Sequence, residues 1–418
     1  MFVLPIIITA LGGFLFLKLR FFPIRHPLRG VRLCAGGIGR DGLRNLALAL
    51  AGTLGVGNVF GVAISIAVGG PGSVLWLLAS GFFAALIKYA EVLLCVDNMQ
   101  GGDGQGGMMY LLKSRLASGR FFGGLYALVC LLLSLTMGAA MQSSAAVSSA
   151  ELVSDVPRPI FVLAFMLLAF AFIFGRRDRI KSITAVLVPL AALFYIALTL
   201  VIIFKYRSEM PRVIGEIFSN ALKPRSAAGG FFGYLSASPI VRGYSTGILS
   251  NEAGAGTSSM AHASSRGGDP VVSGLLGMLE VAVDTSLLCM LTAFAILLPC
   301  GEVTGKSAVA LVVDSLSRAF PFSDYVLLLS VSAFALATVV CWYFYGSVCS
   351  RYLFGAAGER MFLPIYAIGV LIGAVLDCSF FASLSDILLL LLTLLTLPVI
   401  IKSSDRIRAL SEQYGLMD

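Results

Sequence analysis

Residues able to bind ions and small charged molecules are concentrated in a segment that is too apolar for a surface loop. Residues 46–73 read LALALAGTLGVGNVFGVAISIAVGGPGS, so glycines, Thr53 and Asn58 interrupt an apolar run. Glycine leaves helical dihedral angles at little steric cost, and an unwound turn exposes carbonyl oxygens to a cation and N–H groups to an anion. Asn58 adds a neutral amide oxygen and Thr53 a hydroxyl, and both groups suit sodium or a zwitterion.

A second apolar stretch carries the same kind of interruption. Residues 246–259 read TGILSNEAGAGTSS. Glycines four apart, such as Gly57 and Gly61, also permit close helix packing, which is the alternative interpretation. Two polar interruptions separated by five apolar spans favour binding over packing, because paired broken helices mark mid-membrane binding sites between inverted repeats.

Ionisable residues within apolar spans form a second group of candidates, because a charge in hydrocarbon is costly and is retained mainly for function. Lys88 and Glu91 are three residues apart, so we expect them to pair on one helical face. Six such residues lie in the predicted spans: Lys88, Glu91, Arg242, Glu252, Glu280 and Asp284.

The acidic members of this group allow several roles. Glu252 lies in the second interruption, where Arg242 is the one candidate partner, and it either shapes the broken helix or contacts the coupling cation. Glu280 and Asp284 are four residues apart and would repel each other on one face. One of the two is therefore protonated, or both lie near the aqueous edge of the membrane.

These residues belong to a chain whose composition requires a lipid environment. The 418 residues are 58% hydrophobic and 12% charged, with a mean hydropathy of +0.94. Backbone groups in lipid must be satisfied internally, so each apolar stretch of about 20 residues predicts a helix. We predict an all-α polytopic membrane protein with about eleven transmembrane helices, at 2–18, 43–68, 72–96, 121–150, 159–175, 182–204, 229–264, 270–299, 323–350, 361–377 and 383–401.

Basic residues follow the first span and recur in alternate connections, which predicts a cell-membrane protein with the N-terminus outside and the C-terminus in the cytoplasm. Spans two to six and seven to eleven each open with an interrupted helix, which predicts two inverted five-helix repeats. The expected segments are an N-terminal helix with a basic cytoplasmic connection (1–42), the first repeat (43–204), an extracellular connection (205–228), the second repeat (229–401) and a cytoplasmic tail (402–418).

Several classes of function are disfavoured by composition. The net charge of +8 follows from the topology and implies no nucleic-acid partner. Two histidines cannot build a histidine metal site, and eight cysteines without a CxxC pair indicate buried apolar residues. A membrane enzyme would need a nucleophile and base that the spans lack. A channel is disfavoured because two broken helices suit an occluded site better than a continuous pore.

Several ordered motifs resemble the alanine or glycine:cation symporters, also called the sodium:alanine symporter family. The first is GTLGVGNVFGVAISIAVGGPGS followed by KYAEVLLCV. GGMMYLL, GAAMQSS, LSNEAGAGTSSMAHAS, DPVVSGLLGMLEVAVDT and TVVCWYFYGSVCSRYLFG are similar to later segments of the family. The resemblance implies sodium-coupled symport of a small neutral amino acid, and a fold of five plus five inverted helices with one extra N-terminal helix.

The resemblance also implies a site. The substrate carboxylate would lie near the unwound backbone of the first break, and the amino acid would be surrounded by side chains of four spans. The implied substrate residues are Gly55, Val56, Gly57, Gln142, Ile248, Leu249, Ser250, Thr338 and Trp342. By analogy with the wider fold, one sodium would lie near Thr53, Asn58 and Ser250, and a second near Ala51, Leu54 and Thr338. Sodium is the only cofactor implied, and we expect a monomer.

Four positions depart from the family pattern. Val56 replaces a threonine, Leu249 replaces a phenylalanine, and Thr246 replaces a basic residue. Ala337 stands where a serine is expected, which would weaken the second sodium site. These departures leave open a cation-coupled symporter of a larger amino acid or a nucleobase, proton in place of sodium as the coupling ion, and a non-transporting amino-acid receptor.

Overall fold

The computed structural model describes residues 3–37, 39–100, 106–174, 177–222, 238–264, 268–300, 308–376 and 378–417, which form helices and turns without a strand. Most of the buried apolar side chains form one continuous core. The α-helices are α1 (Val3–Lys18), α2 (Phe22–Arg25), α3 (Pro27–Gly37), α4 (Arg40–Thr53), α5 (Val62–Gly69), α6 (Ser73–Gln100), α7 (Met108–Arg115), α8 (Gly119–Leu133), α9 (Gln142–Val153), α10 (Arg158–Ile173), α11 (Arg177–Lys205), α12 (Met210–Asn220), α14 (Pro239–Asn251), α15 (Ser259–His262), α16 (Pro270–Val281), α17 (Met290–Leu297), α18 (Ala308–Leu316), α19 (Ser323–Val375), α20 (Cys378–Lys402) and α21 (Ser404–Gln413).

Six of the described helical segments are long and apolar enough to cross a membrane, and the bent pair at residues 40–53 and 57–69 makes a seventh if it is counted as one span. Helices α1 and α10 are apolar but shorter. The predicted span 229–264 is divided between α14 and α15, and its residues 229–237 lie outside the described residues. The protein therefore has at least six apolar spans, while the count of eleven and the inverted repeat remain predictions.

Helix α19 is too long for one crossing. Its 53 residues would extend about 80 Å at 1.5 Å per residue, whereas the hydrocarbon layer is about 30 Å thick. The backbone leaves helical geometry at Gly355, where φ is 68°, a value that glycine adopts without strain. Gly355 thus separates two helical halves, which correspond to the predicted spans 323–350 and 361–377.

The first predicted interruption is a true break in a helix. Helix α4 ends at Thr53, and the two helical parts on either side of the break are bent by 51°. Leu54 has a ψ of 69°, and the Gly55 N–H bonds the carbonyl of Thr53 at 2.8 Å in place of a helical partner. The helix therefore unwinds at Leu54 and Gly55.

The second interruption is also a break. Helix α14 begins with Pro239 in its first turn and with Ser238 as N-cap, whose hydroxyl accepts a bond from Val241. It ends before Glu252, which adopts the left-handed conformation (φ 53°). Gly254 and Gly256 follow with φ values of 91° and 72°, so the chain turns sharply before α15 begins.

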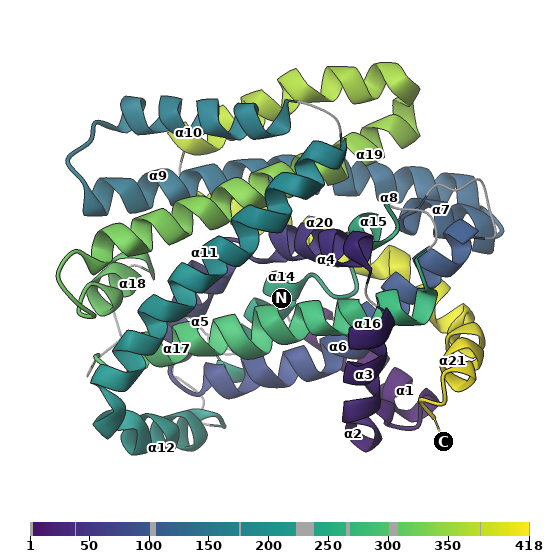
Figure 1. Ribbon diagram of the computed structural model, residues 1–418, viewed down its shortest axis with the longest axis horizontal. Helices are drawn as coiled ribbons and strands as arrows, with labels where there is room; N and C mark the ends of the chain where they lie inside the picture. The colour runs from purple at the N-terminus through teal and green to yellow at the C-terminus, as the bar shows by residue number, and fades with distance from the viewer. Residues whose placement is uncertain are drawn as a thin grey trace.

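The described residues include three short π-helical segments: η1 (Gly57–Gly61), η2 (Ser134–Met141) and η4 (Ala282–Cys289). Segment η1 follows the first break, and η4 lies against η1 and α14. A π-helical turn adds one residue and redirects the side chains around it, and such turns are frequent at functional sites. Helix α6 lies against α14 and α16, and α19 lies against η2, α9 and α11. Figure 1 shows α4 and α14 near the centre of the molecule, surrounded by the longer helices.

Short helices flank the long ones. Helix α12 lies within the connection predicted at 205–228, and the Trp76 indole N–H donates to the carbonyl of Ala221 just after it at 2.8 Å. The sequence patterns did not predict α7, α18 or α21. The C-terminal helix α21 lies at the same end of the molecule as α1 to α3 (Figure 1), where Lys18 and Asp405 form an ion pair. Which side of the membrane this end faces remains a prediction.

Candidate functional site

The first break lies directly against two of the implied substrate residues. The Val56 N–H donates to Oε1 of Gln142 at 3.1 Å, and the Thr338 hydroxyl contacts the Leu54 carbonyl at 3.4 Å. Gly55 lies between these side chains: an added Cβ would be 2.9 Å from Oε1 of Gln142 and 3.0 Å from Oγ1 of Thr338. A side chain at this position would displace Gln142 or Thr338, and the structure brings these five residues together.

Trp342 covers the same break from α19. The side chain is fully buried, and its indole N–H donates to the Gly52 carbonyl at 3.3 Å. An added Cβ on Gly138 would lie 2.2 Å from the Cβ of Trp342, so a glycine in η2 is needed to admit the indole. Trp342 is therefore part of the interior wall and not an anchor at the membrane interface.

Asn58 links the two broken helices. Its amide nitrogen donates to the Ser250 hydroxyl at 3.0 Å and to Oδ1 of Asp284 at 2.6 Å. The Ser250 hydroxyl in turn donates to Oδ2 of Asp284 at 2.7 Å, and Thr285 donates to the same oxygen at 2.8 Å. All four side chains are buried, and this contact joins η1, α14 and η4 at one point.

The remaining implied residues differ in burial and in the contacts of their side chains. Ala51 and Ile248 are fully buried, whereas Leu249 and Gly57 are half-buried. The Thr53 hydroxyl contacts the carbonyl of Ala49 in its own helix at 3.5 Å, so its side chain does not join the Asn58 contacts.

The second break is held by side chains from neighbouring helices. The Gly256 N–H donates to Oε1 of Glu91 at 3.0 Å, and the Tyr126 hydroxyl donates to the carbonyl of Ala255 at 2.8 Å. Thr396 donates to the carbonyl of Gly254. These contacts satisfy backbone groups that lost helical partners, as the membrane interior demands.

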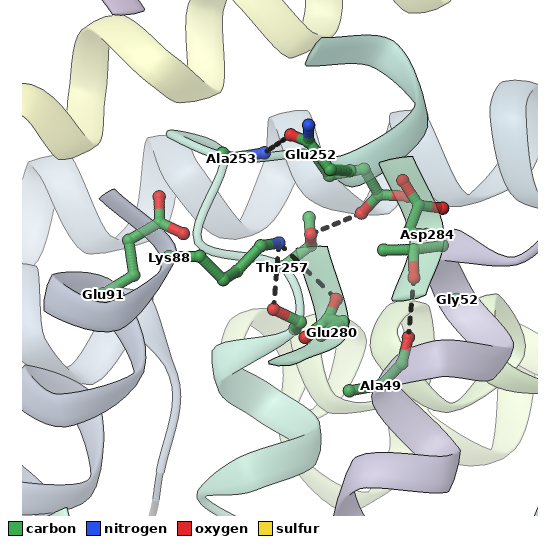
Figure 2. Close-up of polar contacts among 12 residues, drawn as sticks. Ala49, Gly52, Lys88, Glu91, Glu252, Ala253, Thr257, Glu280 and Asp284 are labelled. Carbon is green, nitrogen blue, oxygen red and sulfur yellow. Dashed lines mark hydrogen bonds and ion pairs between the residues drawn. The ribbon is translucent and has the colours of Figure 1, made fainter. Parts of the chain in front are cut away.

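The expected pair of Lys88 and Glu91 is wrong. The Lys88 ammonium lies 3.6 Å from Oε1 of Glu280 and 3.1 Å from the hydroxyl of Ser258. Figure 2 shows the Lys88 side chain extending toward Glu280 and away from Glu91. Oε1 of Glu91 instead accepts the N–H of Gly256. Lys88 instead joins α6 to α16 and to the start of α15.

Glu252 does not pair with Arg242. The Glu252 carboxylate accepts a bond from Thr257 within the second break (Figure 2). Arg242 lies ten residues earlier in α14, about 15 Å along the helix, and packs beside Gly69 at the end of α5. Glu252 therefore shapes the break that contains it, one of the two expected roles.

Glu280 and Asp284 avoid repulsion by taking different partners. Glu280 lies near Lys88 and 3.4 Å from Nε2 of His262, whereas Asp284 accepts from Asn58, Ser250 and Thr285. Both carboxylates are fully buried within the protein, and their depth in the membrane remains a prediction. The sequence marked Asp284 as unusual but did not reveal that it faces both breaks.

Solved structures share the fold of this chain. The structure of MhsT in complex with L-phenylalanine matches with a TM-score of 0.61 and 13% identity, covering 91% of this chain and 94% of that one. A Na+-coupled sialic acid symporter in a substrate-bound outward-open state matches with a TM-score of 0.60 and 11% identity, covering 98% and 86%. These neighbours establish a fold shared with Na+-coupled transporters.

The family follows from the sequence. The model of the sodium:alanine symporter family matches residues 1–416. The sodium/alanine symporter AgcS of Methanococcus maripaludis is 30% identical over 361 residues, covering 82% of this chain and 77% of that protein. The transporter YflA of Bacillus subtilis is 30% identical over 439 residues, covering 99% and 92%. The chain belongs to the sodium:alanine symporter family, a family of multi-pass membrane transporters and not of enzymes.

Proposed function

We propose that this protein carries a small neutral amino acid, alanine or glycine, into the cell together with sodium by alternating access. Membership of the family makes the protein a cation-coupled amino-acid symporter. The AgcS relative, described as a sodium/alanine symporter, supports alanine as the substrate. The neutral oxygens of Asn58 and Ser250 support sodium over a proton as the coupling ion.

The observation that carries this proposal is the contact between Val56 and Gln142. The Val56 N–H at the unwound turn is a donor of the kind that binds a carboxylate, and the amide oxygen of Gln142 accepts from it at 3.1 Å. An arriving carboxylate would replace this oxygen and release Gln142 to contact the substrate. The absence of a side chain at Gly55 leaves the backbone open to a close approach.

The small size of the proposed substrate is consistent with the wall of the site. Trp342 and Gln142 lie close to the broken backbone, and Thr338 lies on the same face of α19 as Trp342, four residues earlier. These three side chains would limit the space beyond the α-carbon of a bound amino acid.

Coupling would arise because both ligands bind the same broken helix. A cation beside Asn58 would order the turn that follows Val56, and the substrate carboxylate would order the turn that precedes it. If sodium raises the affinity for alanine, alanine must raise the affinity for sodium by the same factor. Rocking of one helix bundle against the other would then expose the site alternately to the two sides.

The test is uptake of radiolabelled alanine by the purified protein in proteoliposomes, with sodium and proton gradients imposed separately. We expect an inward sodium gradient to drive accumulation that a proton gradient does not reproduce. Equal accumulation without a sodium gradient would exclude sodium coupling. Binding of alanine without any uptake would support a receptor, and preference for a larger amino acid or a nucleobase would replace the proposed substrate.

A further inference from the structure

The connection between α1 and α4 carries a concentrated positive charge. Residues 18–44 contain seven lysines and arginines and one acidic residue, Asp41. Lys18 is paired with the C-terminal helix α21, but Arg25 and Arg32 are exposed and form no ion pair among the residues that the structure describes. Like charges gathered on an exposed surface attract an anionic partner. The two arginines are therefore available to such a partner.

Helix α3 places apolar side chains beside these charges. One face of α3 lies on α16, where an added Cβ on Gly30 would be 3.6 Å from Cδ2 of Leu275. The opposite face carries Leu28 and Val31, which are 70% and 65% exposed. Residues three or four apart share a face of a helix, so Leu28, Val31 and Arg32 form one outward surface. This surface combines exposed apolar groups with a positive edge.

The chain holds α3 at the surface of the membrane. Its 11 residues extend about 16 Å, which is too short to cross a hydrocarbon layer of about 30 Å. Helix α3 begins soon after the apolar helix α1 ends at Lys18, and it ends shortly before α4 begins at Arg40. Figure 1 shows α2 and α3 at the edge of the molecule. A short helix with arginines beside exposed apolar side chains is typical of helices that lie in the headgroup layer.

We propose that α3 is a docking surface for anionic phospholipids, with Arg25 and Arg32 on the headgroup phosphates and Leu28 and Val31 in the apolar layer beneath them. This inference goes beyond transport, because it concerns the lipid and not the substrate. A lipid fits this surface better than a soluble protein does, since both ends of α3 are tied to apolar helices. The positive charge selects anionic over zwitterionic headgroups.

Lipid bound at α3 acts on a helix that leads to the candidate site. Gly37 at the end of α3 lies so close to α16 that an added Cβ would be 2.9 Å from Cγ2 of Val272. Helix α16 continues directly into η4, whose Asp284 accepts a bond from Asn58. A lipid-bound α3 therefore restrains the first turn of α16 and stabilises the folded arrangement, which an unfolding measurement detects.

The test is thermal unfolding of the purified full-length protein in a neutral detergent, titrated separately with phosphatidylglycerol, phosphatidylcholine and inorganic phosphate. A lipid that binds the folded protein raises the unfolding temperature. We expect phosphatidylglycerol to act at a lower concentration than phosphatidylcholine, and inorganic phosphate to have no effect. R25Q/R32Q should need at least about tenfold more phosphatidylglycerol, because each arginine near an anionic surface contributes about a fivefold gain in affinity.

Two further variants separate recognition of lipid from a general effect of charge. R207Q/R360Q removes two positive charges from exposed positions outside residues 18–44 and should respond as the native protein does. R25K/R32K keeps the charge and should retain most of the response. Equal dependence on phosphatidylglycerol in the native protein and R25Q/R32Q would overturn the proposal, as would equal stabilisation by inorganic phosphate. A dimer that R25Q/R32Q abolishes and that phosphatidylglycerol does not affect would replace the lipid by a second copy of the chain.

Discussion

The proposed contact with the substrate depends most directly on three residues: Gly55, Val56 and Gln142. The break was predictable because glycines and an asparagine weaken a regular helix in the middle of an apolar run. The contact with Gln142 was implied only by family resemblance, because residues 86 positions apart cannot be placed side by side from one sequence. The partnership of Asn58 with Asp284 was missed for the same reason.

Replacing Gly55 by alanine should impair substrate binding with little effect on the rest of the protein. The added Cβ would lie 2.9 Å from Gln142 and 3.0 Å from Thr338, so one of these side chains must move. We expect at least a tenfold loss of alanine affinity, about 1.4 kcal/mol, in equilibrium binding. Gly124→Ala is the matched control because a Cβ there meets nothing within 4 Å. Equal affinities of the two variants would remove Gly55 from the site.

Trp342 should set the size limit of the substrate. Trp342→Ala removes the indole that covers the Gly52 carbonyl, so larger neutral amino acids should compete better against radiolabelled alanine. The protein contains one other tryptophan, Trp76, which bonds the backbone at Ala221 and provides the control Trp76→Ala. An unchanged competition profile for Trp342→Ala would show that another side chain limits substrate size.

Ala337 tests whether a second sodium site has been weakened. It is fully buried in α19 next to Thr338, which contacts the Leu54 carbonyl. Ala337→Ser adds a hydroxyl at this point, and we expect a higher Hill coefficient for sodium activation of uptake. A Hill coefficient equal to that of the native protein would indicate that the hydroxyl does not create a site.

At the scale of elements, the long apolar spans were predictable and the π-helical segments were not. Gln142 donates to the carbonyl of Met137, and Asp284 and Cys289 both contact Asn58, so each pair is separated by five residues. In an α-helix, residues five apart lie on different faces. A search for α-helical spacing therefore could not detect these contacts. The sequences of the π-helical segments contain no proline that would mark the change from α-helical to π-helical winding.

Lys88 and Glu280 form a buried ion pair between α6 and α16. Removing one of the two charges should lower the free energy of unfolding. Both side chains are at most 1% exposed. Lys88→Met leaves the carboxylate without its cation, and we expect a loss of about 3–5 kcal/mol in stability. Adding Glu280→Gln should recover most of this loss. Thermal unfolding of both variants measures the effect, and additive losses would show that the two residues act independently.

At the scale of the whole molecule, the C-terminal tail is attached to the end of the molecule that carries α1 to α3. Arg406 contacts both carboxylate oxygens of Asp97 at 3.1 and 2.6 Å, and Ser411 bonds the hydroxyl of Tyr89 at 2.7 Å. Tyr414 bonds Asp269, the N-cap residue of α16. The sequence predicted a tail but not this attachment, since its polar composition is equally compatible with a free segment.

Loss of the Arg406 contact should loosen the tail without unfolding the spans. We expect Arg406→Ala to increase hydrogen exchange of the α21 amides while exchange in α6 and α16 remains slow. Equal protection of α21 in the native protein and the variant would show that apolar packing holds the tail alone.

The hydrogen bond to Asp269 raises the pKa of Tyr414 from 10.0 to about 12. The contribution of this bond to stability is therefore present below pH 10 and is lost as the pH rises toward 12.

The central claim is that a cation and an amino acid bind the two broken helices as one coupled unit. The most direct measurement is the affinity of the purified protein for alanine, determined by equilibrium binding over a range of sodium concentrations. The account predicts that sodium raises this affinity at least tenfold in the native protein and that Asn58→Ala abolishes the increase. Alanine binding that is tight and independent of sodium in the native protein would contradict the account.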